Sequence, residues 1–232
     1  RDFLSVADFS AEEVGLVFAT AAKLKSEFRA TRRHADLRLA GRTLAMLFQK
    51  PSLRTRVTFE AGMVQLGGHP IYLTHDAVLG ARESVRDVAR NLERFVDGIV
   101  VRTGPHEVAQ ELAAQADVPV INGLTLREHP CQALADDFTI QERFGDLRGL
   151  VVTFVGDGNN VSHSLALLGP APRPPAWRAP WLCCLPEPRP TRVTGLERQG
   201  RFLRDQPRGN YRCPMIGRIR IPAQPAPPFP SR

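Results

Sequence analysis

The sequence predicts an α/β fold, in which a parallel sheet with flanking helices is followed by the start of a second α/β domain and an irregular tail. Short apolar runs recur along the first 155 residues, and stretches with a helical pattern separate them. Such alternation is typical of parallel strands joined by right-handed crossovers. The composition then changes near Gly169, since 5 of the 20 prolines precede residue 170 and the other 15 lie between residues 170 and 230. Most helices and strands of any length would be broken by these prolines, so the ordered part is expected to end there.

The first element expected is a helix through the run AEEVGLVFATAAKLKSEF. Ser10 and Glu13 form a capping-box pattern at its start, because each side chain can satisfy the backbone N–H of the other residue. The apolar positions expected on its buried face are Val14, Val17, Phe18 and Ala21.

The remaining elements follow as alternating strands and helices. The apolar runs suit buried parallel strands at residues 43–48, 70–73, 98–101, 118–121 and 150–155. Helical patterns lie between them at Arg54–Gln65, Ser84–Phe95, His106–Ala116 and Cys131–Phe144. A polar link at 142–149 separates the units, which gives domains at 1–145 and 146–169 and a disordered or aberrant tail at 170–232.

The net charge of +7 comes from the tail alone. Residues 1–169 contain 19 Lys and Arg against 21 Asp and Glu, whereas residues 170–232 contain 12 Arg, no Lys and 3 acidic residues. A basic patch for nucleic acid is therefore not expected on the folded part. The four cysteines, Cys131, Cys183, Cys184 and Cys213, show neither metal-ligand spacing nor a disulfide framework. No apolar run approaches the roughly 18 to 20 residues of a membrane span, so a cytoplasmic protein with no metal, cofactor, nucleic acid or membrane partner is expected.

The run PSLRTRVTFE, residues 51–60, has two arginines, a serine and a threonine within five residues, 52–56, after an apolar run and before a helical pattern. Backbone N–H groups and the positive end of the helix dipole then meet at 52–56, which suits an anion. Ser52 and Thr55 can donate from their hydroxyls, and the Arg54 guanidinium matches phosphate oxygens. A capped, basic helix start on the surface is the simpler alternative.

Polar groups follow three further strands. Arg102 ends one strand, His129 and Gln132 lie in HPCQALAD after the next, and GDGNN follows the run at 150–155. Each has a simpler explanation by itself, namely a helix cap, a local hydrogen bond or a turn. However, ligands of open α/β sheets bind at the carboxyl ends of the strands, where these groups converge. Together they predict a site for a phosphate-containing substrate and a second polar ligand.

These residues resemble the motifs of the aspartate/ornithine carbamoyltransferase family. FQKPSLRTRVTFE is similar to the family's carbamoyl phosphate motif, VRT with Arg102 to its second phosphate-contacting strand end, and HPCQALAD to its third motif. FVGDGNNVSHSL resembles the ornithine-specific branch, because the aspartate-specific branch lacks the paired asparagines. The resemblance covers roughly residues 2–168.

The resemblance implies two α/β domains, a homotrimer with shared sites, and transfer of the carbamoyl group of carbamoyl phosphate to the δ-amine of L-ornithine, giving citrulline and phosphate in arginine metabolism. It implies that phosphate is bound by Ser52, Arg54, Thr55 and Arg102, and that the carbamoyl group is held and polarised by Thr55, Arg102, His129 and Gln132. Asn160 is implied to contact ornithine. Fixed cationic and hydrogen-bond donors aimed at the developing oxyanion and at the leaving phosphate would catalyse the transfer without a metal or cofactor.

Departures from the family pattern occur in three places. Val78 stands where a glutamine of a shared-site loop is usual, with Ala81 and Arg82 where Arg-Gly is usual, and Leu126 stands where an aspartate is usual. The family's later S-M-G loop and H-C-L-P motif are missing, and CCLP at 183–186 comes too early after Asn160 to replace the latter. The change of composition after Leu168 predicts a frameshift near that codon.

Four alternatives therefore remain open. The chain could be an active ornithine enzyme, a carbamoyltransferase with another amino acceptor, or an inactive fragment that binds only carbamoyl phosphate. A module that binds nucleic acid through its Arg-rich tail is a fourth, although regular aromatic interleaving is missing there.

Overall fold

The computed structural model describes residues 1–74, 83–145, 152–155, 158–168, 181–184, 211–213 and 217–219. The chain divides into two compact units, one of Arg1–Phe154 with Gly158–Cys183 and one of Val155–Asp157 with Cys184–Arg232. The departures predicted at Val78, Ala81 and Arg82, the first two residues of GDGNN and the end of CCLP lie outside the described residues.

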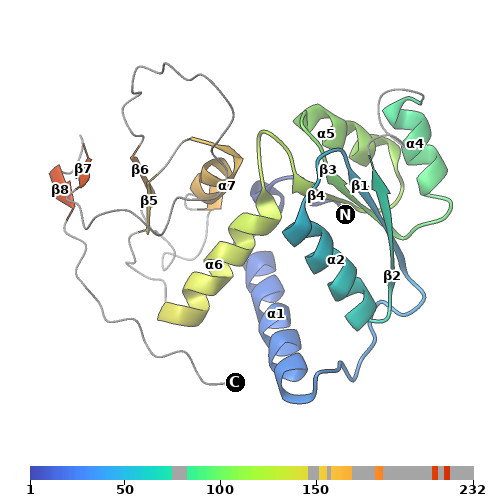
Figure 1. Ribbon diagram of the computed structural model, residues 1–232, viewed down its shortest axis with the longest axis horizontal. Helices are drawn as coiled ribbons and strands as arrows, with labels where there is room; N and C mark the ends of the chain where they lie inside the picture. Colours follow the sequence, from blue (N-terminus) through green and yellow to red (C-terminus); the bar gives the residue numbers. More distant parts are fainter. Residues whose placement is uncertain are drawn as a thin grey trace. The chain divides into compact units, whose positions relative to one another are not determined.

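A four-stranded parallel sheet forms the centre of the first unit (Figure 1). Its strands are β1 (Thr43–Phe48), β2 (His69–Thr74), β3 (Gly98–Arg102) and β4 (Val120–Leu124), in the order β2-β1-β3-β4. Every pairing between them is parallel. The predicted α/β fold with a parallel sheet is thereby confirmed.

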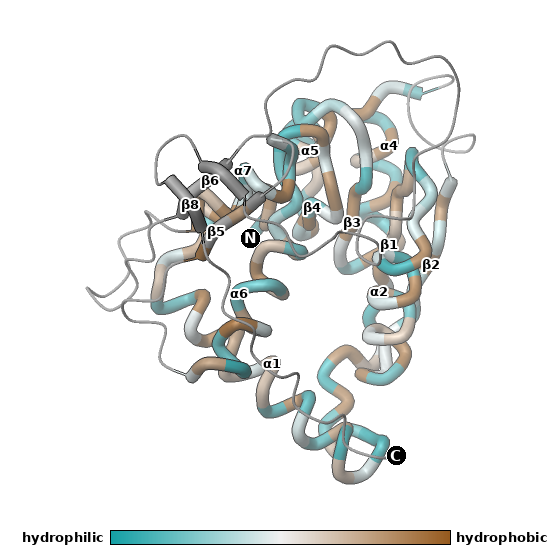
Figure 2. The backbone as a smooth tube through the Cα atoms, turned by 60° about the vertical axis from the view of Figure 1, so that its left-hand side comes forward, coloured by the Kyte–Doolittle hydropathy of each residue, from teal (hydrophilic) through white to brown (hydrophobic). Residues whose placement is uncertain are grey.

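Helices connect and flank these strands. They are α1 (Ala11–Thr31), α2 (Leu53–Gln65), α4 (Val85–Leu92), α5 (His106–Gln115), α6 (Pro130–Phe144) and α7 (Asn160–Leu168), and a short 3₁₀ helix, η1 (Val6–Asp8), precedes them. Teal and brown residues alternate along α1 and α6 in Figure 2, as amphipathic helices require. The bounds of the predicted helices agree with the observed ones to within three residues at each end.

Alternating residues of the central strands face two different helical layers. Ala45, Leu47, Ile99 and Val101 pack with α4 and α5 in one buried cluster. Leu44, Met46, Phe48 and Val100 pack with Met63 of α2 in another. Figure 1 shows α2 on one side of the sheet and α4 and α5 on the other. Because successive side chains of a strand point to opposite faces, strands covered on both sides are continuously apolar, as TLAMLF is.

Two predicted strands differ from the observed ones. The run at 70–73 was expected to be fully buried, but β2 is an edge strand whose residues are exposed or half-buried. The run at 118–121 was placed too early, because β4 begins at Val120, after Pro119, and continues to Leu124. Proline has no N–H for the ladder, although the Pro119 carbonyl still accepts from Ile99 N over 2.9 Å.

A third apolar cluster joins the N-terminus to α1, α6 and α7. Its buried members are Phe3, Val6, Val14, Phe18, Ala133, Leu134, Leu165 and Leu168. The predicted capping box of α1 is confirmed, since the Ser10 hydroxyl accepts from Glu13 N and the Glu13 carboxylate accepts from Ser10 N. The prediction for Val17 was wrong, because its side chain is 38% exposed. The buried face of α1 is therefore narrower than the apolar pattern of its sequence suggested.

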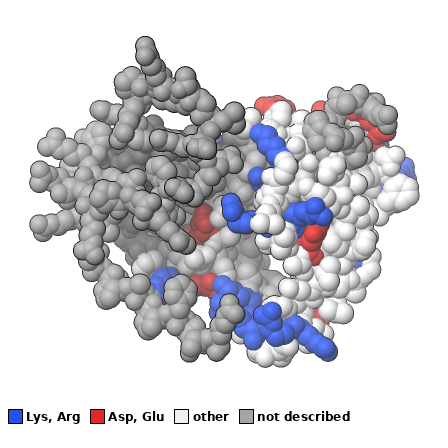
Figure 3. All heavy atoms as spheres, in the orientation of Figure 1, with Lys and Arg blue, Asp and Glu red and all other residues white. Residues whose placement is uncertain are grey.

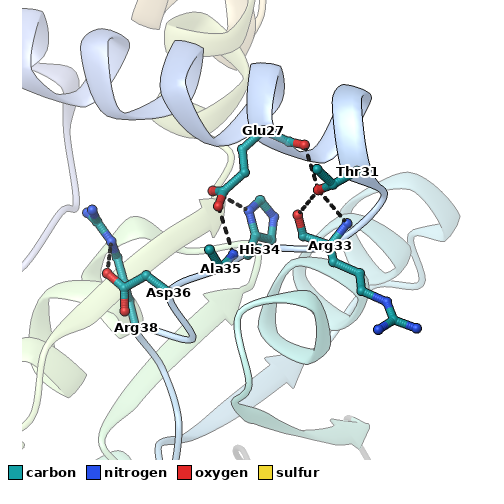
Figure 4. A network of polar contacts seen from close by, with 7 residues as sticks. All are labelled: Glu27, Thr31, Arg33, His34, Ala35, Asp36 and Arg38. Carbon is teal, nitrogen blue, oxygen red and sulfur yellow. Dashed lines mark hydrogen bonds and ion pairs between the residues drawn. The ribbon is translucent and has the colours of Figure 1, made fainter.

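A network of polar contacts fixes the chain where α1 ends (Figure 4). The Glu27 carboxylate accepts from Ala35 N over 2.7 Å and lies 3.2 Å from His34 Nδ1. The Thr31 hydroxyl donates to the carbonyls of Glu27 and Arg33, at 3.0 and 2.7 Å. These bonds hold the turn against the last residues of α1. The chain continues from there to β1.

The tail was predicted to be irregular, but it contains short strands. They are β6 (Trp181–Cys184), β7 (Tyr211–Cys213) and β8 (Gly217–Ile219), of which the last two form an antiparallel pair. β6 pairs with β5 (Val152–Val155). Trp, Tyr and Ile favour extended backbone, and these runs fall between the prolines.

Candidate active site

The carboxyl ends of β1, β3 and β4 lie at one level of the sheet. Phe48, the last residue of β1, is opposite Arg102 at the end of β3, and Arg102 is opposite Leu124 at the end of β4. Just beyond, Gln49 N donates to the Arg102 carbonyl over 2.9 Å, and Thr103 N donates to the Leu124 carbonyl over 3.0 Å. The segments that follow these strands are thus held side by side, as the sequence predicted.

The helix start after β1 is organised by Ser52 and Thr55. Ser52 is the N-cap of α2, and its hydroxyl accepts from Thr55 N over 3.4 Å. The same hydroxyl donates to Thr55 Oγ1 over 3.0 Å. No acidic residue lies in the first turn of α2. The positive end of the helix dipole is therefore not neutralised locally, and an anion is favoured there.

Arg102 reaches this helix start from β3. Its Nη1 donates to Thr55 Oγ1 over 3.4 Å, while its buried Nε has no hydrogen-bond partner among the described residues. Burial lowers the pKa of Arg102 from its ordinary value, and the positive charge of Arg54 lowers it further. Two guanidinium groups so close repel each other, and an anion between them would remove that penalty.

The two arginines of α2 have different surroundings. Arg54 is exposed. Arg56 has partners of its own. Its Nε donates to Glu60 over 2.9 Å, and its guanidinium lies 3.7 Å from the centre of the Tyr72 ring. Figure 3 shows Lys and Arg side chains in several separate groups on the described part of one face, with Asp and Glu side chains beside some of them. The charge that suits an anion here is local.

His129 lies between β4 and α6 and is the N-cap of α6. Its Nδ1 is buried and has no hydrogen-bond partner among the described residues. Burial, followed by the charge of Arg102, lowers the pKa of His129 to about 4. The imidazole is therefore neutral at pH 7 and can offer one N–H donor and one acceptor. Arg102 thus couples electrostatically to both the helix start and the histidine.

Gln132 and Asn160 are held by other partners. The exposed Gln132 donates from Nε2 to Asp136 Oδ1 over 2.8 Å, one turn further along α6. Asn160 donates from Nδ2 to the Thr125 carbonyl over 2.6 Å and so fastens the start of α7 to the loop after β4. The structure brings Ser52, Thr55 and Arg102 into direct contact, but it shows no such contact between this group and either amide.

Among the described residues, no group of three or more His, Cys, Asp or Glu side chains is placed to hold a metal ion. None of the helices described is long and apolar enough to cross a membrane.

The chain that carries this site is similar to a known family. Residues 1–142 match the family model for the carbamoyl-P binding domain of aspartate/ornithine carbamoyltransferases. The chain belongs to this family.

Curated relatives of this carbamoyltransferase chain are ornithine carbamoyltransferases. Those of Anoxybacillus flavithermus and Carboxydothermus hydrogenoformans are 51% and 54% identical to it over 168 residues, which is 72% of the chain and 53% of each relative. The chain therefore spans about half the length of the curated relatives that it matches.

Solved structures agree with the family. The ornithine carbamoyltransferase of Pyrococcus furiosus superposes with a TM-score of 0.74 and 44% identity, over 81% of this chain and 58% of that one. The enzyme of Thermus thermophilus gives 0.72 and 46%, over 82% of this chain and 64% of that one.

Several polar residues of the site were not anticipated from the sequence. The Thr103 hydroxyl donates to Gln49 Oε1 and links the ends of β3 and β1. Glu128 and Ser164 are almost completely buried beside His129. Nothing in their spacing marks these residues, since their partners lie up to 123 residues away along the chain. The position of Glu128 within the EHPCQ run was the one available signal.

Proposed function

We propose that this carbamoyltransferase chain binds carbamoyl phosphate at the carboxyl ends of β1, β3 and β4, and that the protein transfers the carbamoyl group to the δ-amine of L-ornithine, giving citrulline and phosphate. The observation that carries the proposal is the contact of Arg102 with Thr55 at the capped start of α2. The ornithine carbamoyltransferases to which the chain is similar support the choice of reaction.

The phosphate would be bound by Ser52, Arg54, Thr55 and Arg102. Hydroxyl donors, a helix N-terminus and two guanidinium groups supply hydrogen bonds and positive charge without a metal. As the bond from the carbonyl carbon to the phosphate oxygen breaks, negative charge grows on the leaving phosphate. Donors fixed before the reaction stabilise that charge at little cost in reorganisation.

The carbamoyl group would lie toward Thr55, Arg102, His129 and Gln132. When the amine attacks the carbonyl carbon, the carbonyl oxygen gains negative charge, and donation from Arg102 and the neutral His129 would stabilise it. Gln132 would first have to release Asp136, to which its amide is bonded. Asn160 would contact ornithine through the amide oxygen that its bond to Thr125 leaves available.

Assembly, location and domain limits complete the proposal. We propose a homotrimer located in the cytoplasm, with a role in arginine metabolism, and domains at 1–145 and 146–169 followed by an aberrant tail.

Two assays test the proposal. Isothermal titration of the purified chain with freshly dissolved carbamoyl phosphate should show saturable binding that inorganic phosphate competes with. A citrulline assay with carbamoyl phosphate and ornithine should show product, and an assay for carbamoyl aspartate with aspartate in place of ornithine should show none. Binding without product would restrict the function to carbamoyl phosphate binding, and absence of binding would contradict the proposal.

A further inference from the structure

Beside His129 lies a buried polar chain that connects it to two distant segments. The Ser164 hydroxyl of α7 accepts from His129 N over 2.9 Å and donates to Glu128 Oε2 over 3.4 Å. The same carboxylate oxygen accepts from Ser5 Oγ over 3.1 Å and from Val6 N over 3.4 Å. Ser164 is fully buried and Glu128 is 2% exposed.

His129 depends on its backbone for its position. Its Nδ1 has no partner among the described residues, so no side-chain bond at that atom orients the ring. Its carbonyl accepts the first helical bond of α6 from Ala133 N over 3.1 Å, and its N–H is bonded to Ser164. Pro130 follows directly and restricts the backbone of the residue before it. Of these contacts, the bond from His129 N to the Ser164 hydroxyl is the one that comes from a different helix, α7.

We propose that Ser164 and Glu128 are positioning residues that hold the His129 peptide so that its imidazole can contact the carbamoyl group. This inference rests on the proposed function. Ser164 supplies the acceptor for His129 N, and the Glu128 carboxylate orients the Ser164 hydroxyl. A buried carboxylate needs several donors to remain in such a place, and Ser5, Val6 and Ser164 supply three. Helix α7 thereby contributes to the carbamoyl side of the site.

The phosphate side of the site is independent of this chain of bonds. Ser52 and Thr55 are held by the start of α2, and Arg102 by β3. None of these residues has a described hydrogen bond to Ser164 or Glu128. Loss of the Ser164 hydroxyl should thus weaken binding of carbamoyl phosphate but not of inorganic phosphate. A general loss of structure would weaken both.

The test compares the affinities of the full chain for carbamoyl phosphate and for inorganic phosphate by isothermal titration. Wild type should prefer carbamoyl phosphate. Ser164→Ala should reduce this preference roughly ten-fold, because small misplacements of a contacting group are costly, while the Kd for inorganic phosphate changes by less than about two-fold. Ser164→Thr, which keeps a hydroxyl, should retain most of the preference.

Ser162→Ala is the matched control. Ser162 lies on the same helix and is also buried, but its hydroxyl bonds only to Asn159 among the described residues. This variant should keep the wild-type preference. If Ser164→Ala fails to fold, Glu128→Gln replaces it, because it keeps the shape of the side chain and weakens the acceptor. A loss of about three-fold in the preference is then expected.

The outcomes separate this inference from the proposed function. If wild type prefers carbamoyl phosphate and the variants keep that preference, or lose affinity for both ligands equally, the positioning role is overturned and the proposed function stands. If wild type binds carbamoyl phosphate without preferring it to inorganic phosphate, the positioning role is overturned. If wild type does not bind carbamoyl phosphate at all, both are overturned.

Discussion

Arg102 at the end of β3 donates to the hydroxyl of Thr55 in the first turn of α2, although 47 residues separate them along the chain. The bond is 3.4 Å long, and the guanidinium keeps a buried Nε without a partner in the described part of the structure. The guanidinium therefore retains donor capacity beside the first turn of α2, which a phosphate group would use.

Removing this guanidinium should weaken phosphate binding. Arg102→Gln is expected to raise the Kd for inorganic phosphate by about ten-fold or more, because a hydrogen bond to a charged group contributes about 1.5–3 kcal/mol. Isothermal titration measures the change. Arg38→Gln, which alters an exposed arginine paired with Asp36, is the control and should bind as wild type does. Equal affinities of wild type and Arg102→Gln would exclude Arg102 from the phosphate site.

The low pKa of His129 should make stability depend on pH. Burial lowers this pKa from 6.5 to about 4, so between these values the unfolded chain binds more protons than the folded one. The contribution of His129 to the free energy of unfolding is thus complete above pH 6.5 and is lost as the pH falls toward 4. Urea unfolding at pH 7 and pH 4.5 should show a smaller decrease for His129→Gln than for wild type.

The exposed His69 supplies the control for this experiment. Between pH 7 and pH 4.5, the free energy of unfolding of His69→Gln should decrease as much as that of wild type. If the free energy of unfolding decreased equally with falling pH in wild type and in His129→Gln, His129 would not be held neutral by the fold.

Glu27 should stabilise the turn after α1 only while it is ionised. The hydrogen bond from Ala35 N, and then that from His34, lower its pKa below the ordinary 4.5. Its contribution is therefore present above pH 4.5 and is lost as the pH falls below that value. Thermal unfolding should show a lower Tm for Glu27→Gln than for wild type at pH 7, and a smaller difference at pH 3. Glu111→Gln, at an exposed position of α5, should show neither effect.

The attachment of α7 should depend on the donor of Asn160. Asn160→Asp replaces an N–H that donates to the Thr125 carbonyl with a carboxylate oxygen, which that carbonyl repels. A loss of about 1–3 kcal/mol in the free energy of unfolding is expected from urea titration.

The neighbouring residue offers the same chemical change without that loss. Asn159 uses its side-chain oxygen to accept from Val161 N and Ser162 N at the start of α7. Asn159→Asp keeps this acceptor and adds a negative charge at a helix N-terminus, so it should leave stability unchanged or slightly raised. Equal losses in both variants would contradict the role assigned to the Asn160 donor.

The amino-acid sequence by itself determined the local parts of the site. The start of α2 and the strand that ends at Arg102 depend on neighbours within a few residues, and the structure has them within one residue of the predicted places. The alternation of strands and helices likewise fixed the parallel sheet, since parallel strands need crossovers.

The tertiary structure alone decided which of these parts meet. Strand order places β1 between β2 and β3, so that β2 is an edge strand, and Arg102 becomes level with the end of β1. The buried bonds of Glu128 with Ser5 and Ser164 join residues 123 and 36 positions apart. The shift of the His129 pKa arises from burial and from Arg102, which ends another strand. Burial and charge act through space, and a local sequence pattern does not specify which distant side chains will exclude water from a residue.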